Sequence, residues 1–146
     1  MSDSDLLHAY LATVWTVHGP GGEVEVRPGR SAPPPLRPAG IVTAWNPASA
    51  QLSLDENERA DGQLRARIAA AGLIAWPTLA HGTGDDGSWD EPGWCLRGDV
   101  RGDAIRLGAE FGQNAIVWID AEGGVTIVCT RARFCGGEIG EVLDAR

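Results

Sequence analysis

The chain has 146 residues and a net charge of −8 at pH 7, with 43% hydrophobic and 22% charged residues. This length fits one globular domain, residues 1–146, whose core needs neither disulfides nor metal. An acidic chain lacks the basic face that nucleic acid or an anionic membrane requires, so we expect neither partner. All 12 basic residues are Arg, which excludes a lysine nucleophile.

The cysteines indicate a reducing compartment. Cys95, Cys129 and Cys135 lack the C-x-x-C spacing of a zinc or redox site, and scattered thiols of odd number fit a cytoplasmic protein. The acidic start of the chain has no apolar signal core, and no run reaches the ~18 apolar residues of a membrane span. No metal and no cofactor are predicted, because the three histidines have no ligand spacing either.

The first third of the chain predicts a short helix, a hairpin and a loop. Leu6–Tyr10 forms the helix, with Ser4 or Asp5 as its cap. Alternation over Ala12–His18 and Glu23–Arg27, around a glycine-rich turn, predicts a hairpin whose second arm lies at a sheet edge. The five prolines of residues 28–38 exclude a helix and favour a surface loop, with recognition by a proline-binding domain as the alternative.

A central strand and a well-marked helix follow. Ile41–Trp45 is apolar on both faces, which is typical of a buried strand. Ser53 and Glu56 form the S-x-x-E capping box, so a helix is expected from Ser53 to Ala71. Its inward face carries Leu64, Ile68 and Ala71, and seven residues before Leu64 this face reaches Asn57.

The second half predicts the rest of an α+β fold. We expect a mixed sheet of about six to seven strands with two main helices packed on it, and frayed ends at residues 1–4 and 137–146. A glycine-rich acidic loop is expected at residues 81–88. The expected elements are strands at Leu73–Leu79, Trp94–Arg97, Ala115–Ile119 (central) and Val125–Thr130, and a helix at Asp103–Phe111 capped by Asp103.

Three sequence blocks carry a resemblance to a known family. They are Thr43–Pro47 (TAWNP) followed by Asn57, Trp89–Gly93 (W-x-E-x-G) and Phe111–Ala115 (FGQNA). In this order the blocks resemble the family catalogued as domain of unknown function 3293. The resemblance implies a small stand-alone bacterial protein and supplies no activity. Residues 28–38 depart from the family, in which a helical segment is expected.

Polar residues cluster at the ends of the apolar elements and suggest a ligand site. The predicted ligand-binding residues are Asn46, Asn57, Trp89, Gln113 and Asn114. Glu91 is the predicted catalytic acid or base. Amides and aromatic walls are typical of a pocket that binds a polar or flat ligand. Alternatively, each amide caps a turn or satisfies backbone groups, and Glu91 binds loop N–H groups or Arg59.

Other catalytic arrangements are weaker. His81 is the best single candidate for a general base, although an exposed loop histidine is the simpler interpretation. Asp85, Asp86, Asp90 and Glu91 could hold a divalent cation, but they lack the D-x-D-x-D-G order and a solvated acidic loop explains them. Whether the protein is an enzyme stays open at this point.

Two functions from different classes remain. The first is binding of a small polar metabolite or nucleotide-like ligand in a pocket lined by Asn, Gln, Glu and Trp side chains. The second is a non-catalytic protein-interaction module, in which these polar residues are structural caps. A pocket where they converge favours the first, and amides bonded to backbone with a large exposed apolar patch favour the second.

Overall fold

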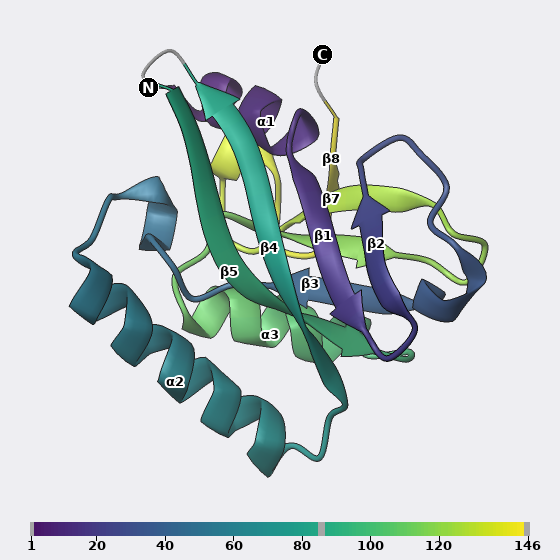
Figure 1. Cartoon of the computed structure of the whole chain (residues 1–146). Coiled ribbons are helices and arrows are strands. Elements are labelled where there is room, and N and C mark those ends of the chain that lie inside the picture. Colours follow the sequence, from purple (N-terminus) through teal and green to yellow (C-terminus); the bar gives the residue numbers. More distant parts are fainter. Residues whose placement is uncertain (1, 85–86, 145–146) are drawn as a thin grey trace.

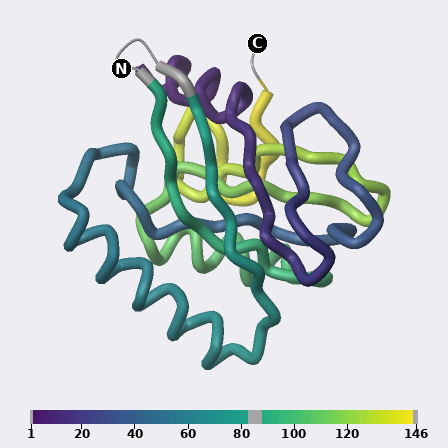
Figure 2. Tube along the Cα trace, viewed as in Figure 1, coloured from purple at the N-terminus to yellow at the C-terminus, as the bar shows by residue number. Residues whose placement is uncertain are grey.

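A computed structural model gives the fold and describes residues 2–84 and 87–144, with the backbone only for residues 83, 84 and 87. Figures 1 and 2 show how the elements are arranged. The α-helices are α1 (Asp3–Leu11), α2 (Leu54–Ala70) and α3 (Arg101–Glu110). The strands are β1 (Val14–Gly19), β2 (Gly22–Val26), β3 (Ala39–Val42), β4 (Ala75–Gly84), β5 (Gly87–Arg97), β6 (Ala115–Ile119), β7 (Val125–Cys129) and β8 (Val142–Leu143).

The strands form one sheet in the order β2-β1-β4-β5-β3-β6-β7-β8, and every neighbouring pair is antiparallel. The predicted α+β class is confirmed. The mixed sheet of six to seven strands is wrong, because the described residues form eight antiparallel strands. Strand β8 has only two residues, too few for an alternating pattern to reveal. A third helix, α1, also packs on the sheet through Leu7.

The connectivity explains why the alternation of strands and helices suggested a mixed sheet. Helix α2 connects β3 to β4 and α3 connects β5 to β6, and the two strands of each pair run in the same direction. However, β5 lies between β3 and β4, and β3 lies between β5 and β6. Both crossovers are therefore split by an antiparallel strand, as in the ferredoxin-like β-α-β-β-α-β unit. The β1–β2 hairpin extends this unit beside β4, and β7–β8 extend it beside β6.

Each face of the sheet carries an apolar cluster. Helices α2 and α3 cover one face with side chains that include Leu64 and Ala104. Helix α1 covers the opposite face, called the α1 face below, through Leu7, and Leu36 and Phe134 join the same cluster. Figure 1 shows that the sheet is strongly twisted, so that β1, β4 and β5 run across the direction of β3 and β7.

Helix α2 begins where its capping box predicts. Ser53 Oγ accepts the N–H of Glu56 at 3.1 Å, and Glu56 Oε1 accepts the N–H of Ser53 at 3.4 Å. Asn57 and Leu64 are buried, which confirms the helix phase that the spacing predicts. Ala71 is exposed, contrary to prediction, because it is the C-cap residue and lies beyond the last turn that faces the sheet.

The other two helices begin differently from prediction. Helix α1 is capped by Ser2, which forms a capping box with Asp5, and not by Ser4 or Asp5. Helix α3 has no side-chain cap, and Asp103 lies instead in its first turn, where it accepts a hydrogen bond from Arg106 at 2.7 Å. An acidic group in the first turn still suits the positive end of the helix dipole.

The two apolar strands are central, as predicted, but one is shorter than expected. β3 lies between β5 and β6, and β6 between β3 and β7. β3 ends at Val42 and not at Trp45. Thr43 Oγ1 donates to Pro92 O at 2.7 Å and accepts the N–H of Trp45 at 3.1 Å. The Thr43 side chain therefore takes the place of the backbone hydrogen bonds that would continue the strand. Asn46 then adopts a left-handed conformation with φ 46°.

The predicted glycine-rich loop at residues 81–88 is largely part of a hairpin. β4 and β5 continue through the described residues of this stretch, where Gly82 is paired with Trp89. A Cβ at Gly82 would collide with the Trp89 ring, so the ring covers the glycine across the two strands. The Trp89 ring thus packs where Gly82 has no side chain, which stabilises the strand pair. Because this contact comes from the partner strand, the glycine-rich composition of the segment does not predict a strand. Asp85 and Asp86 lie outside the described residues.

The proline-rich segment is more than a surface loop. It contains no α-helix, as predicted, and has one 3-10 turn at Pro34–Leu36. Ala32 and Leu36 are only 2% and 1% exposed and belong to the core of the α1 face. The surface-loop interpretation is therefore wrong for these two residues, because the prolines around them conceal an apolar contact.

Both ends of the described chain carry structure. Residues 2–4 form the cap and the start of the first turn of α1, and residues 137–144 include β8. Residues 1, 145 and 146, also expected to fray, lie outside the described residues. Across residues 2–84 and 87–144, no helix is long and apolar enough to cross a membrane.

Candidate functional site

Strand β5 places the W-x-E-x-G block on the α1 face. Trp89, Glu91 and Gly93 alternate along the strand, and alternate residues of a strand share one face. All three line the same hollow. A Cβ at Gly93 would lie 2.8 Å from Val42 O and 3.0 Å from Thr78 Oγ1, so a larger residue would force the strands apart. Trp89, Glu91 and Gly93, the three residues that define the block, therefore form one wall of the hollow.

The hollow is partly enclosed and small, with a volume of about 40 Å³. This volume is close to that of one or two water molecules, since each occupies roughly 30 Å³ of the liquid. It is far below the roughly 300–1,000 Å³ of sites for drug-sized molecules, so only a small chemical group fits inside. The polar residues that line it are Tyr10, Thr13, Thr43, Thr78 and Glu91.

Among the described residues, Glu91 has the only carboxyl group in the wall of the hollow. Burial raises the pKa of Glu91 from an ordinary 4.5 to about 7, and the hydrogen bond from Asn46 offsets this only in part. That bond runs from Asn46 Nδ2 to Glu91 Oε2 and is long, at 3.3 Å. A carboxyl group with a pKa near 7 is present in both protonation states at neutral pH, so it can donate or accept a proton.

Thr78 supplies a second unusual group. It faces Gly93 across the β4–β5 pair and is 4% exposed. Its Oγ1 has no hydrogen-bond partner among the described residues. Leaving a buried hydroxyl unpaired costs about 1–3 kcal/mol, and most buried polar groups are paired. A donor or acceptor bound in the hollow would remove this cost.

The two asparagines of the first block bind each other. Asn57 Oδ1 accepts the backbone N–H of Asn46 at 2.9 Å, and Asn57 Nδ2 donates to Asn46 Oδ1 at 2.9 Å. Asn46 Oδ1 also accepts the N–H of Leu52 at 3.0 Å. The pair therefore fixes the turn after β3 to the start of α2, and it leaves Asn46 Nδ2 directed at Glu91.

The third block holds the same turn from the other side. Gln113 Nε2 donates to Trp45 O at 3.0 Å, and Asn114 Nδ2 donates to Ser49 Oγ at 3.0 Å. Gln113 and Asn114 are 3% and 0% exposed. The FGQNA and TAWNP blocks are thus physical neighbours, and the amides of the former position the latter.

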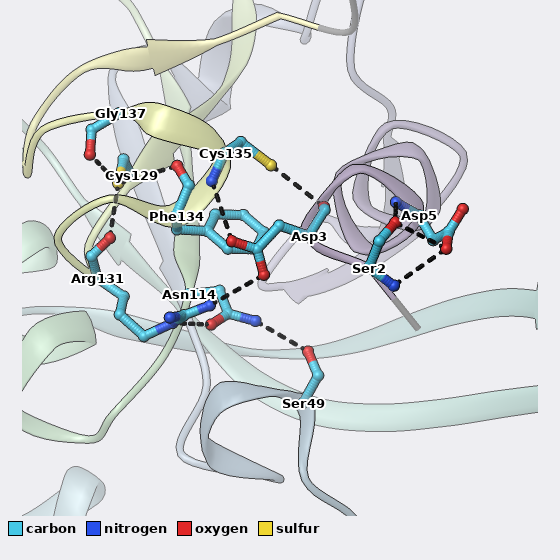
Figure 3. A network of polar contacts seen from close by, with 10 residues as sticks. All are labelled: Ser2, Asp3, Asp5, Ser49, Asn114, Cys129, Arg131, Phe134, Cys135 and Gly137. Atoms are coloured by element: carbon cyan, nitrogen blue, oxygen red, sulfur yellow. Dashed lines mark hydrogen bonds and ion pairs between the residues drawn. The ribbon is translucent and has the colours of Figure 1, made fainter.

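A polar network links this turn to α1, as Figure 3 shows. Arg131 Nε donates to Asn114 Oδ1 at 2.6 Å, and Arg131 also contacts Asp3 Oδ1 at 3.4 Å. Asp3 Oδ2 in turn accepts the N–H of Cys135 at 3.3 Å. The first turn of α1 is therefore bonded to the segment that follows β7, and through Arg131 to Asn114, which precedes β6.

The last turn of α1 brings Tyr10 to the hollow. Burial raises the pKa of Tyr10 above its ordinary value, and the negative charge of Glu91 adds to this, whereas hydrogen bonds with Ser49 and Asn114 act in the opposite direction. The phenol therefore stays protonated and lies between the Asn114 network and Glu91. Helix α1 thus closes the hollow with an uncharged hydroxyl group.

The predicted site residues fall into two groups. Glu91 and Trp89 line the hollow. The other four are amides that form hydrogen bonds with backbone or side chains around it: Asn46, Asn57, Gln113 and Asn114. These bonds favour the structural interpretation of the four amides, and direct ligand binding by them stays a prediction.

Sequence reasoning missed Thr78 and Tyr10. Alternation from Ala80 places Thr78 on the α1 face, so the β4 pattern held a signal once the face was known. Tyr10 comes from a helix far away in sequence, and no pattern along the chain connects it to Glu91. Such a contact depends on the tertiary fold alone.

The weaker candidates lie elsewhere. His81 Nδ1 lies 2.6 Å from Asp90 Oδ1, and both side chains are more than half exposed, at 54% and 57%. No group of metal-ligating side chains occurs within the described part of the chain. A larger and more open groove of about 430 Å³ lies between α1 and the C-terminal segment. It contains none of the predicted site residues, so its size alone does not connect it with the chemistry at Glu91.

The fold and the site define an α+β protein that has a split β-α-β sheet and a partly buried carboxyl group near its first helix. A family model described as "Protein of unknown function (DUF3293)" matches residues 42–116, slightly more than half of the chain. The chain therefore belongs to this family, which confirms the resemblance seen in the three blocks. The matched part runs from the end of β3 to the start of β6 and contains α2, β4, β5 and α3. No curated protein and no solved structure matches the chain.

Proposed function

We propose that the protein binds a small polar ligand in the hollow and that Glu91 exchanges a proton with it. The observation that carries the proposal is the position of Glu91 and Thr78 in the wall of one partly enclosed hollow. Glu91 has a carboxyl group whose pKa burial raises to about 7, and Thr78 has a hydroxyl without a partner in the described residues. A perturbed acid beside an unsatisfied polar group is typical of a binding or active site.

The amides have supporting roles in this proposal. Asn46 donates to Glu91 and so sets the orientation of the carboxyl group. Asn57 and Gln113 hold Asn46 and Trp45 in place. A site built in this way is preorganised, because the group that meets the ligand is held by neighbours that are themselves bonded.

The size of the hollow restricts the ligand. About 40 Å³ accommodates a small polar group but not a nucleotide base, so the ligand is a small metabolite or the polar end of a larger one. Trp89, which is 37% exposed, lies in the wall, so the rest of a larger ligand would pass along this ring.

The alternative, a protein-interaction module, has less support. The amides are bonded internally, as that function expects. The large apolar side chains that are exposed belong to separate segments: Leu54 and Ile74 beside the two ends of α2, Trp89 on β5, and Ile139 and Val142 near β8. We therefore do not carry this function further.

A ligand screen with matched variants tests the proposal. Thermal unfolding of the wild type, Glu91→Gln and Thr78→Val is followed with a library of small polar metabolites, and the exposed Glu58→Gln is the control. A compound at 100 times its Kd stabilises a protein by about 2.7 kcal/mol. We expect at least one compound to stabilise the wild type and Glu58→Gln but neither hollow variant. The proposal is wrong if every stabilising compound acts equally on all four proteins.

A further inference from the structure

The hydrogen bonds that the lining residues already make restrict the class of ligand that the hollow can bind. Thr13 Oγ1 donates its proton to Ala9 O at 2.6 Å, and Thr43 Oγ1 donates to Pro92 O at 2.7 Å. Since the protons of both hydroxyls are engaged elsewhere, they can meet a ligand only through lone pairs, and one lone pair of Thr43 Oγ1 already accepts the N–H of Trp45 at 3.1 Å. The carboxylate of Glu91 is likewise an acceptor when it is ionised. The wall also holds two hydroxyls that can donate: the Tyr10 phenol, which is hydrogen-bonded with Ser49 and Asn114, and the rotatable hydroxyl of Thr78. Its remaining polar groups offer acceptors.

The charges of the lining residues also favour a ligand that donates hydrogen bonds and carries a positive charge. The lining residues include one carboxyl group and no Arg or His, and the chain has no Lys. The only hydrogen bond that Glu91 receives in the described residues is the long one from Asn46. A buried carboxylate without a counter-charge is costly, and an adjacent positive charge offsets that cost. Trp15, which also lines the hollow, presents an aromatic ring, and such rings attract cations.

From this arrangement we infer that the hollow takes the amino end of a primary amine, bound as its ammonium ion. An ammonium group has three donors and no acceptor, which complements the free acceptors of Glu91, Thr13 and Thr43, and Thr78 Oγ1 adds a further acceptor. The hollow is small, at about 40 Å³, so a compact ammonium head suits it better than a bulky trimethylammonium group. This inference rests on the proposed function and names its ligand class.

The binding of an amine depends on the ionisation of Glu91. The other groups near Glu91 are Tyr10 of α1, which stays protonated, Asn46, which is neutral, and Arg131, which lies beyond Tyr10 and Asn114. His81 and Asp90 belong to the alternate positions of β4 and β5 and face away from the hollow. With a pKa of about 7, the ionised fraction of Glu91 rises about tenfold between pH 6 and pH 8. The affinity for a primary amine rises by the same factor, because binding and ionisation are linked.

The experiment uses the full chain with its Glu side-chain carboxyl carbons labelled with ¹³C. Four solutes of equal concentration are compared at pH 6 and pH 8: methylammonium chloride, tetramethylammonium chloride, acetamide and sodium chloride. The readouts are the chemical shift of the Glu91 carboxyl carbon, assigned by its loss in Glu91→Gln, and the temperature of thermal unfolding. Both readouts are recorded on the wild type, and Glu91→Gln serves only to assign the Glu91 signal.

We expect methylammonium alone to shift the Glu91 signal in a saturable manner and to raise the unfolding temperature. Its affinity should be about tenfold higher at pH 8 than at pH 6, because the ionised fraction of Glu91 rises by this factor. Thr78→Val should weaken its binding, because one acceptor is removed.

Three negative results are possible, and they do not all have the same meaning. If acetamide moves the Glu91 signal and methylammonium acts no differently from sodium chloride, the amine inference is overturned but the proposed function stands. The inference is also overturned if tetramethylammonium binds as well as methylammonium, since the hollow would then not select by size. If none of the solutes and no compound of the metabolite screen moves the Glu91 signal, the proposed function fails together with the inference.

Discussion

Burial of a single carboxyl group ties the stability of this protein to pH. The folded pKa of Glu91 is about 7 and its ordinary value is 4.5. Between these pH values the folded protein binds more protons than the unfolded chain, so the free energy of unfolding falls as the pH rises. The stabilising contribution is complete below pH 4.5 and is lost above pH 7. At 1.36 kcal/mol per pKa unit, it is on the order of 3 kcal/mol.

The variant Glu91→Gln removes this dependence. Its amide oxygen can still accept from Asn46, but the side chain does not ionise. We expect the variant to be similar in stability to the wild type near pH 5 and more stable by on the order of 3 kcal/mol at pH 8. Urea unfolding of both proteins across this range measures the difference, in which the titration of other groups cancels. A difference that does not change with pH would contradict the burial of Glu91.

A second prediction at this scale concerns Asn57. Its side chain is 3% exposed and makes two hydrogen bonds to Asn46. In Asn57→Ala the N–H of Asn46 loses its partner in a partly buried position, so the free energy of unfolding should fall by about 1–3 kcal/mol. Gln51→Ala, which alters an exposed amide in the same segment, should change it by less than about 0.5 kcal/mol. Equal effects of the two substitutions in urea unfolding would show that the amide pair does not hold the turn.

At the scale of elements, the close approach of β3, β4 and β5 depends on one glycine. A Cβ at Gly93 would lie 2.8 Å from Val42 O, a backbone atom that can move only with its strand, and 3.0 Å from Thr78 Oγ1. Gly62 in α2 offers the opposite case, because a Cβ there meets nothing within 4 Å. The two glycines therefore separate a packing requirement from the general cost of glycine in a regular element.

The corresponding substitutions should act in opposite directions. Gly93→Ala overpacks the strands and should destabilise by about 1–3 kcal/mol. Gly62→Ala should stabilise by about 0.5–1 kcal/mol, because alanine has the higher helix propensity and less entropy to lose. Chemical denaturation of both variants and the wild type provides the measurement. Stabilisation by Gly93→Ala would mean that the strands are less closely packed than described here.

Elements with local signals could be predicted, and those with tertiary causes could not. The capping box of Ser53 and the apolar spacing after it fix the start and phase of α2 without any knowledge of the fold. The end of β3 could not be predicted, because Thr43 bonds to Pro92, a residue far along the chain. The β4–β5 hairpin was concealed because Trp89 supplies from the partner strand the cover that Gly82 lacks.

At the scale of the whole molecule, the family match follows the split β-α-β unit. The matched residues 42–116 contain both connecting helices and the hairpin between them. The blocks that carried the resemblance lie in contact: Asn46 with Asn57 and Glu91, and Gln113 with Trp45. The sheet order could not be predicted, because β5 enters between β3 and β4, and the local pattern of a strand does not reveal its neighbours.

Only the part of the candidate site that has a local sequence signal could be predicted. Glu91 and Trp89 follow from their place in the sequence blocks, and strand periodicity explains why they share a face. Tyr10 and α1 reach the hollow through tertiary contacts: Leu7 packs in the core of the α1 face, and Asp3 near the start of the chain lies 3.4 Å from Arg131. A contact over this separation in sequence leaves no periodic signal.

We propose that Glu91 is a partly buried acid in the wall of a ligand site. Titration of its carboxyl carbon by ¹³C NMR tests this claim most directly, with Glu91→Gln to assign the signal and the exposed Glu58 as an internal comparison. We predict a midpoint near pH 7 for Glu91, as its burial requires. A midpoint near the ordinary value of 4.5 would contradict the account, because the carboxyl group would then be solvated and the hollow would not hold an acid.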